Sequence, residues 1–532
     1  MITADLLIVN AKILTLDPKI PEAEAIAISG ERIVWLGKTQ DSSAFKGAGT
    51  RVIDADGRSV LPGLIDGHFH LIKGAMQLDK ISGVGTETFA GLKTQILEYQ
   101  QRQPSREFFV GYGLNYGLFD ASRAVRFQLD ELVSDRPLVL FAYDLHTVWA
   151  NTKALEIAGL LHGRTVSAGN EVVMGNDGLA TGELLEREAF GPLANIVEPN
   201  DPNTQKTAVL EALKLAASFG LTGGHNMDGT PETLALYANL ERTGALTMRL
   251  DVPFSVTPHH TPEIIKLALE MRDAVVGNIL TSYRVKFFMD GVIETGTGFL
   301  LEPYADIPNQ IGDALFSHEH FTSIALEADK NNLQIAVHAI GDAAVRRTLD
   351  GLENIRNTNG ARDSRHRIEH IELLHPNDLP RFKTLGVTAS MQPTHAAMSA
   401  TDTVWANRVG RKRWTRAFPW NDLRNALVPL VFGTDFPVVG INPFQAIHDA
   451  MARVPWAEGL PAHGQTLLQA LAGYTRDAAF AQFQEHQKGM LKVGMLADLT
   501  MLTRDISNTP LAEIPNLRSS LTMMGGRVVH ES

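Results

Sequence analysis

The sequence predicts an α/β protein built on a (β/α)₈, TIM-like barrel. Two observations predict it: short apolar strands alternate with helical segments, and eight such strands can be counted. Alternation of strands and helices is typical of βαβ units in a parallel sheet. Eight parallel strands, each with a crossover helix, make a closed barrel. The strands are expected at residues 60–70, 221–227, 248–256, 283–291, 333–341, 366–373, 386–393 and 430–438.

The helical segments between these strands have apolar residues at helical spacing, for example at 207–220, 321–332 and 342–357. The barrel domain is predicted to cover residues 61–480. The stretch from about 77 to 205 does not fit the strand count, although it contains apolar runs of its own. We therefore expect an insertion of about residues 77–205 after the first barrel strand.

The two ends of the chain are expected to form one small β-sandwich domain, with residues 1–60 as its N-terminal part and 481–532 as its C-terminal part. Both segments are rich in β-branched and aliphatic residues. Ser29-Gly30 and Asp56-Gly57 are dipeptides that favour hairpin turns, and Gly525-Gly526 is the expected turn of a third hairpin.

Composition describes an ordinary soluble protein, with 44% hydrophobic and 20% charged residues in 532. A net charge of −12 disfavours nucleic acid or an anionic membrane as a partner. The chain has no cysteine, which excludes disulfides and thiolate ligands. Its beginning has no secretory signal pattern, and no run of 18 apolar residues is present, so a cytoplasmic protein is expected.

The first barrel strand ends in Asp66-Gly67-His68-Phe69-His70. Residues i and i+2 of a strand point to the same side, so the two imidazoles can bind one metal ion. Such a pair is weak evidence by itself, because it also occurs by chance. Other strands supply partners at their carboxyl ends, where catalytic residues of such barrels lie. These residues are Lys286, His338, His370 and Asp435.

The ordered set resembles the amidohydrolase superfamily, and within it the YtcJ-like branch that includes N-substituted formamide deformylases. The resemblance rests on "PGLIDGHFHL", "KFFMDGVIE" with "EPY" downstream, "HAIGDAA", "RIEH", "MQPTH" and "FGTDFPV". It covers nearly the whole chain, from about Asp5 to Val529. The sequence departs from the branch at Thr434, Phe436 and Leu145, none of which is a proposed ligand.

The resemblance implies two divalent metal ions, Zn²⁺ by preference, since imidazole and carboxylate ligands suit zinc and several similar ions. It assigns His68, His70 and Asp435 to the first ion, and His338 and His370 to the second. Lys286 would bridge them as a carbamate, because burial supplies the neutral amine that takes up CO₂. A buried ion pair of Lys286 with Asp290 is the structural alternative.

Metal ions polarise a carbonyl and lower the pKa of bound water to about 7. The resemblance therefore implies hydrolysis of a C–N bond other than a peptide bond, in linear amides or N-formyl and N-acyl amines, by a hydroxide shared between the ions. Asp435 would act as general base and pass the proton to the leaving amine. A helix cap is the alternative for Asp435.

Other functions stay open at this point. Deaminases of the superfamily place a glutamate where this chain has Gly341, which argues against deamination. Ester or lactone hydrolysis would use the same residues, and a non-catalytic regulatory protein could have the same fold. The expected partner is a small-molecule substrate, and family members often form homodimers. Candidate substrate contacts are His146, Trp149, His225, Glu294, Gln392 and His395.

Overall fold

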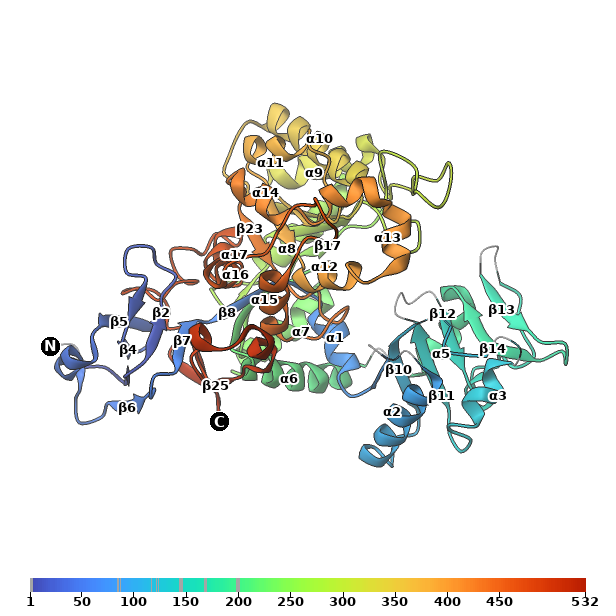
Figure 1. Cartoon of the computed structure of the whole chain (residues 1–532), viewed down its shortest axis with the longest axis horizontal. Coiled ribbons are helices and arrows are strands. Elements are labelled where there is room, and N and C mark those ends of the chain that lie inside the picture. Colours follow the sequence, from blue (N-terminus) through green and yellow to red (C-terminus); the bar gives the residue numbers. More distant parts are fainter. Residues whose placement is uncertain are drawn as a thin grey trace. The chain divides into compact units, whose positions relative to one another are not determined.

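The structure is a computed structural model that describes residues 3–83, 86, 88–115, 117–120, 122, 124–142, 147–166, 170–197 and 201–532. The chain divides into two compact units, and Figure 1 labels some of the helices and strands of each. The first unit comprises Met1–His70 and Leu213–Ser532, and the second comprises Leu71–Ala212. In the part of the chain that is described, no helix is both long enough and apolar enough to cross a membrane.

Parallel strands form the centre of the first unit. One sheet has the order β18-β16-β15-β8, and another has the order β17-β19-β20-β21-β22-β23. Every neighbouring pair in both sheets is parallel. The strands are β8 (Leu64–Phe69), β15 (Leu221–Asn226), β16 (Arg249–Asp251), β17 (Phe254–Ser255), β18 (Leu280–Thr281), β19 (Arg284–Phe288), β20 (Gln334–Ala339), β21 (Arg367–His370), β22 (Thr388–Met391) and β23 (Leu430–Phe432).

Helices connect these strands, as the sequence predicts. In α10 (Asp342–Asn359), Val345, Leu349 and Leu352 recur every three or four residues and are buried, which is the pattern of a helix with one face on the core. The others in this unit are α7 (Pro231–Arg242), α8 (Ile265–Asp273), α9 (His318–Lys330), α11 (Leu379–Leu385), α12 (Pro393–Ser399), α13 (Thr403–Val409), α14 (Trp420–Asn425), α15 (Pro443–Ala452), α16 (Leu467–Gly473) and α17 (Arg476–Ala481). The helix α6 (Pro202–Ser218) contains the boundary between the units.

The two parallel sheets continue into each other along the chain. Residues 252–253 separate β16 from β17, and residues 282–283 separate β18 from β19. At the opposite edges, Asp435 N donates to His68 O at 2.7 Å and His70 N donates to Phe436 O at 2.8 Å. The end of β8 therefore lies beside the segment that follows β23.

Two glycines permit this close approach. A Cβ atom at Gly67 would collide with the backbone at Phe432, and a Cβ atom at Gly433 would collide with the backbone at His68. Glycine is the residue that tolerates such an approach between chain segments. The first and last predicted strands are therefore neighbours at the position where the candidate ligands lie.

Strands from both ends of the chain share one sheet, with the order β26-β25-β24-β7-β2-β3. A second sheet, with the order β5-β4-β1-β6, comes from the N-terminal segment. Ile8, Ile28, Val60, Leu499 and Leu521 pack in one hydrophobic cluster drawn from both sheets. The strands are β1 (Leu6–Val9), β2 (Lys12–Leu14), β3 (Glu22–Ala23), β4 (Ala25–Ser29), β5 (Arg32–Gly37), β6 (Arg51–Asp54), β7 (Ser59–Pro62), β24 (Leu499–Leu502), β25 (Ser519–Met524) and β26 (Arg527–Glu531).

The predicted hairpins differ in outcome. β4 pairs antiparallel with β5 across Gly30, and β25 pairs antiparallel with β26 across Gly525 and Gly526. The hairpin expected at Asp56-Gly57 is wrong, because β6 and β7 belong to different sheets. A turn is present there, with Gly57 at φ 75°, but it carries the chain from one sheet to the other. The dipeptide predicts the local backbone conformation and not the partner of each strand.

Short 3₁₀ helices complete the first unit. They are η1 (Thr39–Phe45), η2 (Pro262–Ile264), η3 (Arg411–Arg416), η4 (Ile506–Asn508) and η5 (Leu511–Asn516).

The second unit contains the predicted insertion of about residues 77–205. It is built on one mixed sheet with the order β13-β14-β12-β11-β10-β9. Its strands are β9 (Ile81–Ser82), β10 (Phe109–Leu114), β11 (Leu138–Ala142), β12 (Thr147–Ala150), β13 (Glu171–Met174) and β14 (Ala180–Leu185). Its helices are α1 (Leu71–Gln77), α2 (Phe89–Arg102), α3 (Val125–Asp130), α4 (Thr152–Ile157) and α5 (Arg187–Val197).

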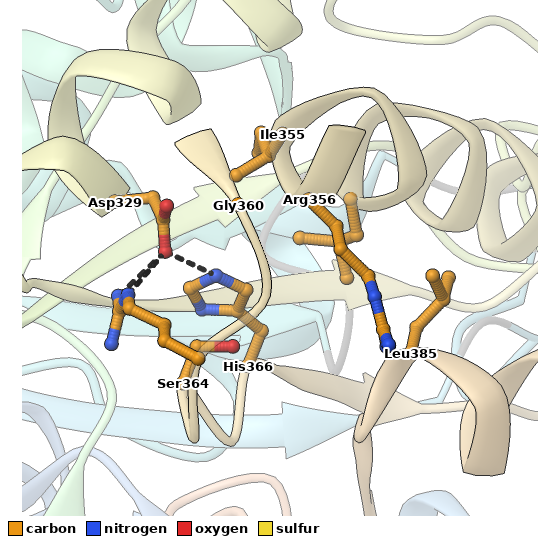
Figure 2. A pocket seen from close by; sticks show the side chains of 9 residues that line it. Asp329, Ile355, Arg356, Gly360, Ser364, His366 and Leu385 are labelled. Atoms are coloured by element: carbon orange, nitrogen blue, oxygen red, sulfur yellow. Dashed lines mark hydrogen bonds and ion pairs between the residues drawn. The ribbon is translucent and has the colours of Figure 1, made fainter. Parts of the chain in front are cut away.

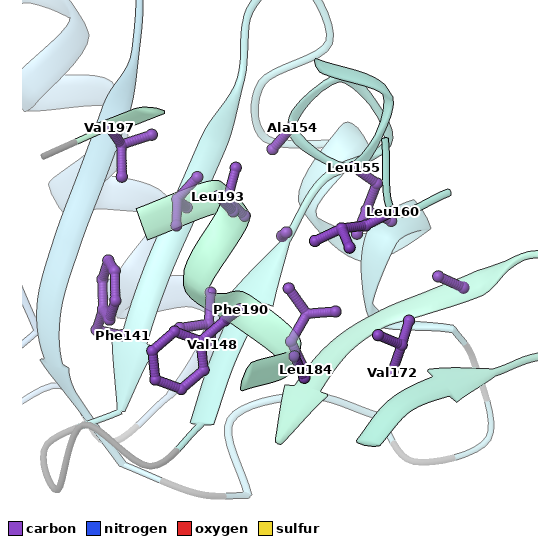
Figure 3. Packing of buried hydrophobic residues seen from close by; sticks show 14 of the residues in the cluster. Phe141, Val148, Ala154, Leu155, Leu160, Val172, Leu184, Phe190, Leu193 and Val197 are labelled. Atoms are coloured by element: carbon purple, nitrogen blue, oxygen red, sulfur yellow. The ribbon is translucent and has the colours of Figure 1, made fainter. Parts of the chain in front are cut away.

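Alternate residues of β11 enter two separate hydrophobic clusters. Val139 and Phe141 belong to one, and Leu138 and Leu140 belong to the other, so both faces of the strand are covered. Figure 3 shows the first cluster, in which Phe190, Leu193 and Val197 of α5 pack together with Phe141, Val148 and Leu184 of the sheet. The second unit therefore has a hydrophobic core of its own.

Candidate metal centre

Three predicted ligands meet where β8 ends. One carboxylate oxygen of Asp435, Oδ1, lies 3.3 Å from His68 Nε2 and 3.1 Å from His70 Nε2. All three residues are buried, and their candidate ligand atoms lie within 4.8 Å of one another. The sequence separates the histidines from Asp435 by more than 360 residues, and the pairing of the strand ends brings them together.

The buried carboxylate of Asp66 holds this part of the backbone. It accepts hydrogen bonds from His68 N at 3.1 Å, from Thr434 N at 3.0 Å and from the Thr434 hydroxyl at 2.6 Å. Burial raises the pKa of Asp66 to about 6 against the opposite effect of these hydrogen bonds. Asp66 thus ties the segment with the two histidines to the segment with Asp435.

A second buried carboxylate orients His68. His68 Nδ1 lies 2.8 Å from Glu369 Oε2, and Arg367 contacts both Glu369 oxygens at 2.5 and 2.9 Å. Burial alone would raise the pKa of Glu369, but Arg367 and His68 hold it well below its usual range. Because Glu369 is therefore ionised, His68 Nδ1 donates the proton to it, and the lone pair of Nε2 faces Asp435.

A different carboxylate lies beside His70. Its Nδ1 lies 3.2 Å from Asp228 Oδ2, while its Nε2 faces Asp435. Burial opposes the charged form of His70, but Asp228 and Asp435 outweigh it and raise the pKa of the ring. Metal-binding histidines commonly have a carboxylate at the ring nitrogen that faces away from the ion.

The other oxygen of Asp435 faces two further histidines. Asp435 Oδ2 lies 4.0 Å from His370 Nδ1 and 3.8 Å from His395 Nε2. The ring centroid of His370 lies 4.8 Å from that of His68. His370, His395 and Asp435 form a second group whose ligand atoms lie within 4.8 Å of one another.

The backbone is unusual at two of these residues. His370 has φ 74° and Asp435 has φ 60°, a left-handed conformation that few residues other than glycine adopt. In a regular strand, consecutive side chains point to opposite faces. Here Glu369 contacts His68 from one side and His370 lies beside the same ring, so the departure from the strand at His370 lets neighbouring side chains reach one cluster. Such backbone strain often marks functional sites.

The remaining predicted ligands, His338 and Lys286, are also buried. The ring centroids of His338 and His370 lie 4.4 Å apart. His338 Nε2 lies 3.1 Å from Gly291 O, and Lys286 Nζ lies 4.0 Å from the ring centroid of Phe288. The carboxylate of Asp290, which the sequence offers as an ion-pair partner for Lys286, accepts hydrogen bonds from the backbone N–H groups of Phe299, Ile340 and Gly341.

Electrostatics favour the neutral forms of His338, His370 and His395 and the ionised form of Asp435. Burial, followed by the nearby Lys286, lowers the pKa of His338 to about 3. Burial also lowers the pKa of His370 and of His395. Burial works against ionisation of Asp435, but the surrounding imidazoles hold its pKa well below the usual range. Neutral imidazole and ionised carboxylate are the forms that bind a metal ion.

The hydrogen bonding of the candidate ligand atoms also fits a metal site. Buried polar atoms normally have a hydrogen-bond partner. Among the described residues, however, His68 Nε2, His370 Nδ1, His395 Nε2 and Asp435 Oδ1 have none. In a tetrahedral zinc site with bonds of about 2.1 Å, two ligand atoms lie about 3.4 Å apart. The separations of 3.1 and 3.3 Å on one side of Asp435, and of 3.8 and 4.0 Å on the other, are close to that spacing.

The candidate substrate contacts have different surroundings. Gln392 is buried, and both polar atoms of its amide lack a partner in the part of the chain that the structure describes. Burial raises the pKa of Glu294 to about 7. His225 lies in a buried network behind the ligands, with Nδ1 2.7 Å from Arg367 Nη1. Substrate contact by these three residues stays a prediction.

The two candidates from the insertion belong to the second unit. Trp149 is buried in a hydrophobic cluster of that unit, and its indole N–H donates to Glu183 at 3.2 Å. His146 lies outside the described residues.

Sequence reasoning missed Asp66, Asp228, Arg367 and Glu369, although each lies within a short distance of a predicted ligand along the chain or in space. Asp66 precedes His68 by two residues, and Arg367 and Glu369 belong to the "RIEH" stretch that ends in His370. The alternation of a strand places Arg367 and Glu369 on one side, which is a usable signal for a buried ion pair. Asp228 follows β15 and carries no local signal.

Parallel strands with a buried cluster of histidines and a carboxylate at their carboxyl ends define an α/β protein with a candidate metal centre. A model of the amidohydrolase family matches residues 51–530. The chain belongs to the amidohydrolase family, as its motifs predict.

The comparisons with individual proteins agree with this assignment. The chain is 31% identical to the protein LONG AFTER FAR-RED 3 of Arabidopsis thaliana, over 96% of this chain and 90% of that protein. It is 26% identical to the putative amidohydrolase YtcJ of Bacillus subtilis, over 91% of each chain. It is 24% identical to an N-substituted formamide deformylase of Arthrobacter pascens, over 99% of this chain and 98% of that protein.

A solved structure has the same fold over most of the chain. It is an uncharacterized metal-dependent hydrolase from Pyrococcus furiosus, with a TM-score of 0.73 and 26% identity, and the match covers 93% of this chain and 98% of that one. This chain therefore shares its α/β fold with a protein described as a metal-dependent hydrolase.

Proposed function

We propose that this protein is a metal-dependent hydrolase of C–N bonds other than peptide bonds, acting on linear amides or on N-formyl and N-acyl amines. The observation that carries the proposal is the position of Asp435, whose Oδ1 faces the Nε2 atoms of His68 and His70 inside a buried cluster. The likeness to a protein named N-substituted formamide deformylase, which extends over nearly the full length of both chains, supports the substrate class.

In this proposal the parallel strands close into a (β/α)₈ barrel, with β8 and β23 as the neighbours that complete it. The backbone hydrogen bonds between the end of β8 and the segment after β23 support that closure. A barrel places the ends of different strands around one opening, which is where catalytic residues of this architecture lie. Closure explains why His68, His370 and Asp435, from three strand ends, lie together.

His68, His70 and Asp435 would hold the first metal ion, preferably Zn²⁺. His370 would hold a second, with His338 and carbamylated Lys286 as the further ligands that the sequence suggests. When bound, such ions polarise an amide carbonyl and increase the acidity of water. Glu369 and Asp228 keep the rings of His68 and His70 turned so that each Nε2 faces the site.

Asp435 would move the proton during hydrolysis. Its carboxylate is ionised and lies at the centre of the cluster, so it can accept a proton from the attacking water and deliver it to the leaving nitrogen. The buried surroundings limit access of bulk water, which strengthens electrostatic interactions within the site. This function assigns a chemical role to a carboxylate that would otherwise be a costly buried charge.

The structure gives a reason against deamination at this site. The position where related deaminases have a glutamate is Gly341, and a Cβ atom there would collide with the backbone of Phe299. Without a rearrangement of that segment, no side chain fits at this position. Deamination is therefore not favoured as an alternative to hydrolysis.

The proposal is tested by measuring metal content and turnover together. Protein purified with Zn²⁺ and bicarbonate should contain about two metal ions per chain by elemental analysis. It should then be screened against N-formyl amines, N-acyl amino acids and simple esters. Turnover of an N-formyl or N-acyl amine that a strong chelator abolishes and Zn²⁺ restores would support the proposal. Metal-free protein with undiminished activity would contradict it.

A further inference from the structure

We propose that the first unit contains a buried binding site for a small monovalent anion of the chloride class, held by Lys488, His225 and Arg284. The inference goes beyond the proposed hydrolase function and does not depend on it. Two observations carry it. The three side chains lie in one buried region with hydrogen-bond donors that lack acceptors, and the positive charge of Lys488 has no carboxylate paired with it among the described residues.

Strand register brings the three side chains together. Gly223 and His225 are two residues apart on β15, so their side-chain positions lie on the same side of the sheet. A Cβ atom at Gly223 would lie 3.5 Å from Lys488 Nζ, which places the amine beside that strand. His225 is the register partner of Asp251 on β16, and Asp251 Oδ2 lies 2.6 Å from Arg284 Nη1. The amine of Lys488 and the guanidinium of Arg284 are therefore both neighbours of His225.

The free ring nitrogen of His225 is a donor. Nδ1 of His225 lies 2.7 Å from Arg367 Nη1. An arginine nitrogen can only donate, so Nδ1 accepts and the proton of the neutral ring is on Nε2. Burial, followed by the positive charge of Arg367, lowers the pKa of His225 well below its usual value, which keeps the ring neutral. Nε2 is buried, and its N–H has no acceptor within the described ranges.

The other two side chains also have buried donors without acceptors. Nζ of Lys488 and Nη2 of Arg284 have no hydrogen-bond partner in the part of the chain that the structure describes. Neither group can accept a hydrogen bond in its charged form, and a buried donor without a partner is costly. A halide ion can accept from several donors at once, whereas a water molecule must also find acceptors for its own protons.

The balance of buried charges favours an anion. Three arginines each pair with a carboxylate at 2.7, 2.6 and 2.5 Å, namely Arg249 with Asp498, Arg284 with Asp251 and Arg367 with Glu369. Lys488 is a fourth cation in this region and is 2% exposed. Burial, followed by the charge of Arg249, lowers the pKa of Lys488 to about 7, since a buried ammonium without a counter-ion is costly. A bound anion would supply that counter-ion.

The size and charge of the ligand follow from the same residues. One positive charge is unbalanced, so a monovalent anion would neutralise the region. The donors of Lys488, His225 and Arg284 are all buried, which excludes a ligand that extends into solvent. Chloride and bromide meet both conditions.

The test combines crystallography with unfolding measurements on the full-length protein. Crystals of wild type grown in sodium bromide are examined by anomalous diffraction, because bromide substitutes for chloride and can be located by its own signal. Thermal unfolding of wild type and of Lys488→Met is measured in sodium chloride and in sodium gluconate at equal ionic strength, since gluconate is too large for a buried halide site. Lys492→Met, at an exposed position, is the matched control.

We expect a bromide peak within hydrogen-bond distance of Lys488 Nζ and His225 Nε2. Chloride should raise the melting temperature of wild type and of Lys492→Met above the value in gluconate by about 1–2 °C, and the rise should saturate with chloride concentration. Lys488→Met should show no such rise. Because this substitution removes a buried charge and keeps an unbranched side chain, the variant should fold.

The inference is overturned if bromide is absent from this region or is found only at the candidate metal centre or on the surface. It is also overturned if folded Lys488→Met keeps the chloride effect of wild type. Should Lys488→Met not fold, the position of bromide in wild type decides the question. None of these results bears on the proposed hydrolase function, since no candidate metal ligand belongs to the anion site.

Discussion

The carboxylate of Glu369 lies 2.8 Å from Nδ1 of His68 and fixes which nitrogen of that ring faces the candidate metal centre. Arg367 holds Glu369 by two contacts and also donates to Gly67 O and to the Ser390 hydroxyl. A single buried ion pair therefore connects β8, β21 and β22 directly behind the ligands. The orientation of His68 therefore depends on groups that lie outside the candidate ligand set.

Replacing Glu369 by Gln should lower the affinity of the protein for the first metal ion. The neutral amide no longer enforces a proton on His68 Nδ1, and loss of such a partner typically lowers metal affinity 10- to 100-fold. Titration with Zn²⁺ would measure this change. Ser390→Ala is the matched control, because it removes one contact of Arg367 and leaves Glu369 and His68 unchanged. Equal affinity of Glu369→Gln and Ser390→Ala would show that Glu369 does not position His68.

Removing Arg367, the cation of the Arg367–Glu369 ion pair, should destabilise the fold. Arg367→Met leaves the carboxylate of Glu369 buried without its cation, and removal of one partner of a buried pair costs about 3–5 kcal/mol. The double variant Arg367→Met/Glu369→Gln should recover part of this loss, since it removes the unpaired charge. Urea unfolding at pH 7 measures both. If the double variant were as unstable as the sum of the two single variants, the pair would not be coupled as described.

Asp435→Asn should fold and keep some metal but lose most of its turnover. Asn tolerates the left-handed backbone that Asp435 adopts, with φ 60°, so the substitution adds little strain. The amide cannot accept the proton from water, and loss of a proton-transfer group reduces kcat by roughly 10²-fold or more. Steady-state kinetics on the best substrate of the screen, together with elemental analysis, check this. A kcat within a fewfold of wild type would show that Asp435 is not the base.

Lys286→Ala should lose activity that short carboxylic acids partly restore, if a carbamate on Lys286 contributes to the second site. The added acid would supply the missing carboxylate in the space that the shorter side chain leaves. Labelled bicarbonate should also give a carbamate carbon signal by NMR in wild type and not in the variant. A variant that keeps its full metal content without any added acid would contradict the carbamate.

Asp329, which is not among the candidate ligands, should make the stability of the fold sensitive to acid. Its carboxylate contacts Arg362 at 2.6 Å and His366 at 3.1 Å, and Figure 2 shows it beside the ring of His366. Burial opposes ionisation, but the hydrogen bond to His366 and the other partners lower the pKa of Asp329 to about 2. Because the pKa of Asp329 is lower in the folded state than in the unfolded chain, its ionisation stabilises the fold at any pH above the unfolded-state pKa. This stability is lost as the pH falls from about 4 toward 2.

Measuring the free energy of unfolding of wild type and of Asp329→Asn at two pH values checks this pH dependence. The variant should be less stable by about 2 kcal/mol at pH 6, and the difference should narrow on going to pH 3.5. Asp313→Asn, at an exposed position, is the control and should track wild type at both values. A difference between wild type and Asp329→Asn that is constant with pH would show that ionisation of Asp329 does not stabilise the fold.

The sequence by itself determined which elements form and which residues could bind a metal ion. Apolar runs of strand length and helices with one buried face depend on the identities of nearby residues, so β20 and α10 could be predicted from local pattern alone. The histidines and Asp435 could be found because they end such strands. The turn at Gly57 was predictable for the same reason, since its backbone conformation is a local property.

Only the tertiary structure decided which groups meet. The hairpin predicted at Asp56-Gly57 is wrong because strand pairing depends on distant segments. Asp228 became a candidate through a contact with His70 that no local pattern encodes. The two pairs of imidazoles on opposite oxygens of Asp435 likewise depend on four strand ends and on φ angles at His370 and Asp435 that break the strand pattern. Local sequence fixes backbone preference, whereas the position of a side chain in a site is set by the packing of the whole unit around it.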